Sequence, residues 1–105
     1  MSVLVEFAMF PTDKGESVSQ YVTEVVRYLR ENANSYQLTS MGSIIETETI
    51  EDAFLLIQES YKILDNLGCN RVYSSLKIDI QKGKSDRMVS KVKSVEEKYN
   101  QKSNM

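Results

Sequence analysis

Histidine and tryptophan are absent from this chain of 105 residues, and cysteine and proline occur once each. The lack of histidine excludes the usual general base, the Ser–His and Cys–His nucleophile pairs and the commonest transition-metal ligand. Cys69 is the single cysteine, so an internal disulfide is excluded, which favours a reducing compartment. We therefore expect a protein without catalytic residues.

Glycine-rich and long apolar segments are also missing. The four glycines are scattered at positions 15, 42, 68 and 83, so no loop of the kind that cradles phosphate is present. The apolar start, MSVLVEFAMF, is too short for a membrane span and carries neither a basic leader nor a cleavage site. We expect a cytoplasmic protein with no membrane partner, no bound cofactor and no metal.

The residues that are present have an ordinary globular composition, but their charges are uneven. Hydrophobic residues make up 41% and charged residues 27%, and the length suits a single domain over residues 1–105. Residues 1–81 hold 12 acidic and 6 basic side chains, whereas residues 82–105 hold 3 and 7. The lysines of the basic end are interleaved with Glu96, Glu97 and apolar residues and show no aromatic stacking pattern, which predicts a solvated helix face and no nucleic-acid partner.

The first half of the chain alternates strand and helix signals. An apolar strand over residues 2–10 stops at Pro11, and Ser17 with Gln20 resembles the capping box of a helix that ends near residues 32–34. Two short strands, 36–41 and 43–49, flank Gly42, as in a tight hairpin. Thr49 is the expected N-cap of the next helix, and Gly68 ends it. The buried stripe of that helix is predicted to include Ala53, Leu56, Ile57, Ser60, Leu64 and Leu67.

The second half predicts one more strand and one more helix. Residues 70–80 alternate, with Arg71, Tyr73, Ser75, Lys77 and Asp79 on one face. Ser85 is the expected cap of a last helix whose apolar residues recur at 4-3-4 spacing, and residues 100–105 are expected to fray. The order β-α-β-β-α-β plus a C-terminal helix predicts an α+β, ferredoxin-like antiparallel sandwich with one sheet face uncovered. The last helix is a candidate for packing across a subunit boundary.

Two groups of polar residues are candidates for a site. Glu46 belongs to an acidic cluster with Glu48, Glu51 and Asp52. In one interpretation these carboxylates complement a helix dipole and solvate the hairpin. In a second, Glu46 binds an amine-bearing ligand, and in a third the cluster binds a divalent metal. The polar face of 70–80, where Glu6 could pair with Arg71 or Lys77, is either a salt-bridged surface or a ligand groove between two sheets.

Three segments in order resemble the small thiamine-binding YkoF-like proteins. They are the first strand ending at Pro11 followed by SVSQYV, TSMGSIIE at 39–46, and GCNRVYSSLKIDIQKG at 68–83. The resemblance implies a ferredoxin-like fold, a homodimer or homotetramer, and non-catalytic binding of thiamine or its hydroxymethylpyrimidine moiety. Matched by position, the implied ligand-binding residues are Met41, Ser43, Glu46, Arg71, Lys77 and Asp79.

The chain departs from the family pattern at four positions. Ser40, Ser43 and Thr47 stand where the family has Pro, Thr and Gly, and Lys82 stands near a family Arg. Replacing an arginine loses its bidentate fork, so ligand identity is less defined than the fold. Two other functions remain open: a regulatory module that docks a protein on the open sheet face, and a cofactor-free enzyme that uses a carboxylate such as Glu46 as base.

Overall fold

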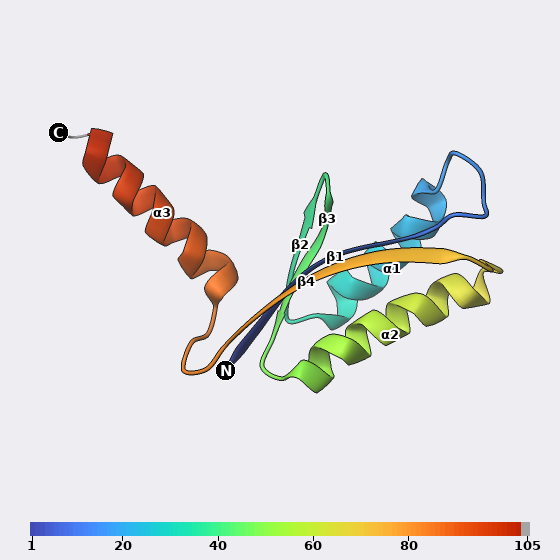
Figure 1. The fold of residues 1–105 in the computed structure, drawn as a ribbon, viewed down its shortest axis with the longest axis horizontal. Helices are drawn as coiled ribbons and strands as arrows, with labels where there is room; N and C mark the ends of the chain where they lie inside the picture. The colour runs from blue at the N-terminus through green and yellow to red at the C-terminus, as the bar shows by residue number, and fades with distance from the viewer. Residues whose placement is uncertain (104–105) are drawn as a thin grey trace.

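The computed structural model describes residues 1–103, and its elements follow the predicted order. The described residues form strands β1 (Ser2–Pro11), β2 (Ser35–Thr39), β3 (Gly42–Thr47) and β4 (Val72–Gln81), and helices α1 (Ser19–Asn32), α2 (Ile50–Asn66) and α3 (Arg87–Ser103). All neighbouring strands are antiparallel, in the order β2-β3-β1-β4. The ferredoxin-like arrangement with an extra C-terminal helix is confirmed (Figure 1).

One face of the sheet carries the core. Val3, Val5, Phe7 and Met9 alternate along β1 toward the side that α1 and α2 cover (Figure 1). They pack with buried residues of β3 and the two helices, namely Val25, Leu29, Ile45, Ala53, Leu56 and Leu64. Leu67 was predicted to be part of this core, but it is exposed because α2 ends one residue earlier, at Asn66.

The helix caps agree only partly with the sequence signals. Thr49 caps α2 as predicted, and its hydroxyl accepts the N–H of Asp52 at 3.1 Å. The capping box predicted at Ser17 is wrong, because α1 begins at Ser19 with Val18 in the cap position and no side-chain cap. Ser85 is not the cap of α3, which begins two residues later, at Arg87.

Gly42 allows the β2–β3 hairpin to close over β1. Its φ is +152°, and a Cβ built there would lie 2.7 Å from the carbonyl oxygen of Phe7. Any side chain at this position would force the hairpin away from the strand. The glycine therefore fixes the approach of β3 to β1, which determines where Glu46 lies.

α3 projects from the rest of the molecule. Figure 1 shows it leading away from the sheet and the other two helices. The radius of gyration is 16.1 Å, compared with about 13 Å for a compact chain of this length. The chain end predicted to fray from residue 100 continues as helix to Ser103, and residues 104–105 lie outside the described part. Within the described residues, α1, α2 and α3 all lack the length and apolar character needed to cross a membrane.

Candidate functional site

The side chains of interest lie on the sheet face opposite α1 and α2. Leu4 of β1 is paired with Glu46 of β3 on one side and with Asp79 of β4 on the other. Opposite residues of antiparallel strands point to the same face, so the two carboxylates flank Leu4. We call this surface, with Leu4, Glu6, Ile44, Lys77 and Asp79, the open face.

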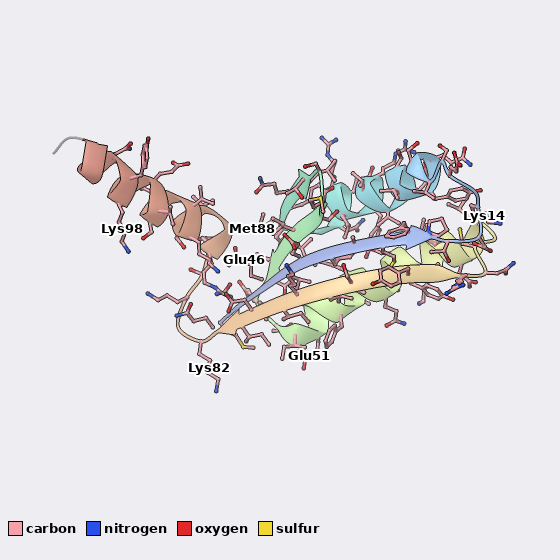
Figure 2. All side chains as sticks on the ribbon, turned by 45° about the horizontal axis from the view of Figure 1, so that its top comes forward. Lys14, Glu46, Glu51, Lys82, Met88 and Lys98 are labelled. Atoms are coloured by element: carbon pink, nitrogen blue, oxygen red, sulfur yellow. The ribbon has the colours of Figure 1, made fainter. Side chains whose placement is uncertain are left out.

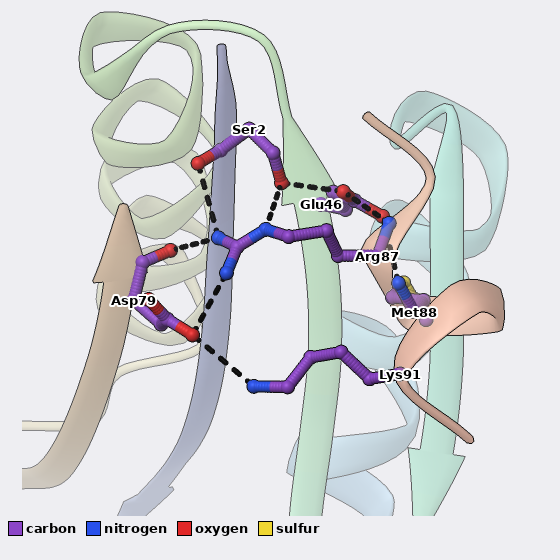
Figure 3. A network of polar contacts seen from close by, with 6 residues as sticks. All are labelled: Ser2, Glu46, Asp79, Arg87, Met88 and Lys91. Carbon is purple, nitrogen blue, oxygen red and sulfur yellow. Dashed lines mark hydrogen bonds and ion pairs between the residues drawn. The ribbon is translucent and has the colours of Figure 1, made fainter. Parts of the chain in front are cut away.

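Glu46 binds the first turn of α3. Its Oε2 accepts the backbone N–H of Arg87 at 2.8 Å, and its Oε1 accepts the N–H of Met88 at 3.1 Å (Figure 3). The hydroxyl of Ser2 also donates to Oε2. The first N–H groups of a helix have no intrahelical partner, and a carboxylate there also complements the positive end of the helix dipole. Glu46, from a strand 41 residues earlier, therefore serves as the cap of α3.

The side chain of Arg87 connects the start of α3 to β1 and β4. Its side chain is only 5% exposed, and Nη1 donates to Asp79 Oδ2 at 2.8 Å. Nε donates to the Ser2 hydroxyl at 2.9 Å, and Nη2 donates to the carbonyl oxygens of Ser2 and Asp79. Lys91, one turn along α3, adds an ion pair of 3.1 Å with Asp79. We give the name clamp to four residues: Ser2, Glu46, Asp79 and Arg87. The clamp joins β1 and the start of α3 to β3 and β4 (Figure 3).

Both carboxylates of the clamp are stabilised in their ionised form. Burial raises the pKa of Glu46, but hydrogen bonds from Ser2, Arg87 and Met88, with the charge of Arg87, outweigh it and hold the pKa below the usual glutamate value. Hydrogen bonds from Lys91 and then Arg87 lower the pKa of Asp79. At neutral pH the two groups accept hydrogen bonds and do not donate them.

The stability of the chain should depend on pH through Glu46. Because its folded-state pKa is lowered, the stabilisation is fully present above the unfolded pKa of about 4.3 and is lost as pH falls through the folded value. Urea unfolding at pH 7, 5, 4 and 3 should show a decline that begins below about pH 5. Glu46→Gln should flatten that decline, and an unchanged slope in this variant would assign the pH dependence to other groups.

A cavity lies on the open face beside the clamp. It measures about 290 Å³ and is lined by Leu4, Glu6, Ile44, Lys77, Ile78 and Asp79. The ammonium of Lys77 lies 3.9 Å from the carboxylate of Glu6, so the predicted pairing of Glu6 with Lys77 is confirmed. The site thus combines aliphatic walls with two carboxylates and one ammonium group. Strands β1, β3 and β4 supply all of its lining, so a second surface is needed to enclose a ligand.

The chain is similar to known proteins, and these similarities identify its family. Residues 5–96 match the family model described as thiamine-binding protein. The chain belongs to this family. A UPF0045 protein of Staphylococcus xylosus is 35% identical over 103 residues, covering 92% of this chain and 94% of that protein. A UPF0045 protein of Mycobacterium bovis is 33% identical over 96 residues, covering 91% and 93%.

Solved structures of similar proteins share the fold. A hypothetical protein from Methanocaldococcus jannaschii matches with a TM-score of 0.77 and 29% identity, covering 91% of this chain and 97% of that one. A Thermotoga maritima protein, named for thiamine biosynthesis or salvage, matches with a TM-score of 0.73 and 18% identity, covering 88% and 99%. The resemblance to thiamine-binding proteins noted in the sequence is confirmed.

The residues carried over from the thiamine-binding family do not form one site within a single chain. Lys77 and Asp79 line the open-face cavity, and Glu46 is in the adjacent clamp. Met41 and Ser43 line a different, apolar cavity of about 320 Å³ between α1 and the β2–β3 hairpin, since Ser43 pairs with Phe7 on the helix-covered face. Arg71 precedes β4 at the end opposite Asp79, where its carbonyl accepts the N–H of Thr12 at 2.8 Å.

The acidic cluster is also divided. Glu46, Glu48 and Asp52 line a cavity of about 330 Å³ beside the end of α1, whereas Glu51 is not part of its lining. Figure 2 shows Glu46 next to Met88, with Glu51 farther away on α2. Within residues 1–103, the acidic and cysteine side chains do not gather into a group that could hold a metal ion. Of the interpretations open at the start, the dipole complement describes Glu46, although the helix is α3.

Ser2 and Arg87 were missed by sequence reasoning. Arg87 belongs to the basic end of the chain, where lysines and arginines were all expected to be solvated, and its burial contradicts that expectation for this residue. One signal was present: the last helix has no Glu or Gln in its first turn to complete a capping box. In the structure Glu46 supplies the acceptor for the first N–H groups of this helix.

Proposed function

We propose that this member of the thiamine-binding family binds thiamine, or its hydroxymethylpyrimidine moiety, without catalysing a reaction. The ligand would occupy the open-face cavity where two copies of the chain meet. The observation that carries the proposal is the pairing of aliphatic walls, Leu4 and Ile44, with the carboxylates of Glu6 and Asp79 in a protein of this family. Transport, buffering and sensing of the ligand are all compatible with such binding.

The charges of the cavity suit a cationic, amine-bearing ligand. The thiazolium ring of thiamine is a cation, and its aminopyrimidine presents an amino group that a carboxylate can accept. Asp79 is ionised at neutral pH, as its lowered pKa requires, and Glu6 lies across the same cavity. The volume of about 290 Å³ is near the lower end of the roughly 300–1,000 Å³ of ligand pockets. A second copy over the open face would enlarge and enclose it.

The clamp supports binding more than catalysis. A carboxylate that acts as general base near neutral pH needs a raised pKa, but the pKa of Glu46 and that of Asp79 are both lowered. Glu46 also uses both oxygens to hold α3. Its contribution to binding would be to keep the wall beside Leu4 in place, while Glu6 and Lys77 face the ligand.

Calorimetric titration with thiamine tests the proposal. Saturable heat is expected with protein and ligand near about 100 µM, a range that reveals micromolar affinity. Glu6→Gln should weaken the affinity about tenfold, because it removes a charge while keeping the shape of the side chain. The matched control is Glu16→Gln, in the loop after β1, which should bind as the unmodified chain does.

Two results would contradict the proposal. If neither thiamine nor hydroxymethylpyrimidine produces heat, neither compound is the ligand. Binding that Glu6→Gln leaves unchanged, but that a bulky substitution at exposed Met41 weakens, would move the site to the apolar cavity between α1 and the hairpin.

A further inference from the structure

Asp79 belongs both to the clamp and to the open-face cavity. It lines the cavity, and its carboxylate accepts hydrogen bonds from two side chains of α3, Arg87 Nη1 at 2.8 Å and Lys91 Nζ at 3.1 Å (Figure 3). Both hydrogen bonds go to Oδ2, and Oδ1 accepts none from residues 1–103. One carboxylate therefore connects the proposed ligand cavity with the last helix.

The two cations that bind Asp79 are held very differently. The side chain of Arg87 is 5% exposed and also donates to the hydroxyl and the carbonyl oxygen of Ser2, which fixes it in the clamp. The side chain of Lys91 is 56% exposed, and within residues 1–103 it forms an ion pair with Asp79 alone. An ion pair as exposed as this adds little stability. Lys91 can therefore leave Asp79 readily, whereas Arg87 cannot.

The charges around the cavity are balanced before a ligand enters. The clamp and the cavity together hold three carboxylates and three cationic side chains: Glu6, Glu46, Asp79, Lys77, Arg87 and Lys91. A cationic ligand would add a positive charge close to like charges, which is unfavourable unless one of the internal cations moves into water. Departure of one lysine restores the balance and leaves its carboxylate to the ligand.

Asp79 is the stronger cation-binding carboxylate of the cavity. It binds two cations at 2.8 and 3.1 Å, whereas Glu6 holds the ammonium of Lys77 at the longer distance of 3.9 Å. The side chain of Lys77 is also 86% exposed, so water screens this second pair more. We therefore expect the positively charged ring of the ligand at Asp79 and its amino group at Glu6.

The ion pair of Lys91 also holds α3 toward β4. The α3 residues that bind the sheet in Figure 3 are Arg87, Met88 and Lys91. Residues 89–100 are all exposed, so packing does not fix the helix beyond its first turn. If Lys91 leaves Asp79, the cap provided by Glu46 remains, but α3 loses its contact one turn farther along.

We propose that Lys91 and the cationic ring of the ligand compete for Asp79, so that ligand binding and the attachment of α3 oppose each other. The inference rests on the proposed function, because it takes the open-face cavity as the ligand site. The coupling is reciprocal: the factor by which the ligand weakens the contact of α3 is the factor by which loss of that contact strengthens ligand binding. Thiamine carries the thiazolium charge and hydroxymethylpyrimidine lacks that ring, so Lys91 lowers the affinity for thiamine alone.

Calorimetric titration of Lys91→Met tests the competition. At low ionic strength, where exposed charges are least screened, this chain should bind thiamine about three- to fivefold more tightly than the unmodified chain. Its affinity for hydroxymethylpyrimidine should change by less than about twofold. Lys93→Met is the matched control, because it removes the same charge from an exposed residue that lies about 200° around the same helix. It should bind thiamine as the unmodified chain does.

Amide hydrogen exchange measures the same coupling from the helix. Saturating thiamine should speed the exchange of the amides of residues 92–100 by about three- to fivefold in the unmodified chain. The amides of Arg87 and Met88, which bind Glu46, should keep their protection. In Lys91→Met the exchange of residues 92–100 should be fast already, and thiamine should not change it further.

The outcomes separate this inference from the proposed function. If the unmodified chain binds thiamine and Lys91→Met binds it equally well, or if Lys93→Met gains as much affinity, the competition is wrong and the ligand site stands. A gain in Lys77→Met but not in Lys91→Met would place the positive ring at Glu6 and would also overturn the inference. If none of these chains binds thiamine, the proposed function fails and the inference fails with it.

Discussion

Replacing Glu46 with alanine is expected to lower the free energy of unfolding by about 3 kcal/mol and to release α3 from the sheet. Hydrogen bonds to a charged group contribute about 1.5–3 kcal/mol each, and this carboxylate accepts three of them. The loss is smaller than their sum because the freed N–H groups of Arg87 and Met88 become accessible to water. The melting temperature should fall by roughly 10–20 °C in a chain of this size.

Far-UV circular dichroism and amide exchange separate this effect from general destabilisation. α3 has 17 residues and projects from the sheet, and most of the stability of a helix in a protein comes from tertiary packing. Its amides should therefore lose protection in Glu46→Ala, while those of β1 and β3 retain theirs. Glu48→Ala, an exposed glutamate two residues along, is the matched control and should change stability by less than about 0.5 kcal/mol. Full protection of α3 in Glu46→Ala would show that the cap is dispensable.

Arg87→Ala should cost a similar amount, about 3 kcal/mol, for a different reason. The guanidinium is buried and donates to Ser2 and Asp79 through all three of its nitrogens. Its removal leaves the carbonyl oxygens of Ser2 and Asp79 without this donor and opens a cavity under the first turn of α3. Equilibrium urea unfolding at pH 7 measures the loss.

Arg87→Lys is the informative companion of that variant. Lysine keeps the charge but cannot present a planar fork, so it can replace only part of the set of hydrogen bonds. We expect it to recover less than half of the lost stability. Full recovery of the stability would mean that the positive charge alone holds α3 against the sheet. The hydrogen bonds to the two carbonyl oxygens would then add little.

The two substitutions should not be additive. Glu46 and Arg87 share the Ser2 hydroxyl, which accepts from Nε of Arg87 and donates to Oε2 of Glu46. Residues in one hydrogen-bond network usually couple by 0.5–3 kcal/mol, so the double variant should be less destabilised than the sum of the single losses. Such coupling is the expected behaviour of one clamp and not of two separate contacts.

The secondary structure was largely predictable because its signals are local. The alternation of β4 placed Tyr73, Lys77 and Asp79 together on one face, and the register with β1 confirms this for Lys77 and Asp79. Thr49 and Gly68 marked the ends of α2 because capping depends on residues within one turn. Ser17 gave a false signal, since a matching pattern two residues before the helix satisfies the spacing but not the geometry.

The clamp was less predictable because its members are far apart in the chain. Glu46 stood out in the sequence as a candidate ligand partner, but its own hydrogen bonds go to residues 2, 87 and 88. Arg87 resembled the surrounding basic residues, and no local pattern distinguishes a buried arginine from a solvated one. Met41 and Ser43 are close to Glu46 in sequence, yet Ser43 lies on the other face because strand residues alternate.

The sequence by itself determined the order of the elements, the apolar face of each and the absence of histidine chemistry, because periodicity, turn residues and composition are properties of short segments. Tertiary structure decided which carboxylate caps α3, which arginine is buried and which edge of the sheet remains unpaired. Those outcomes depend on pairing between strands and helices that are tens of residues apart, and long-range contacts of this kind leave no periodic signature in the chain.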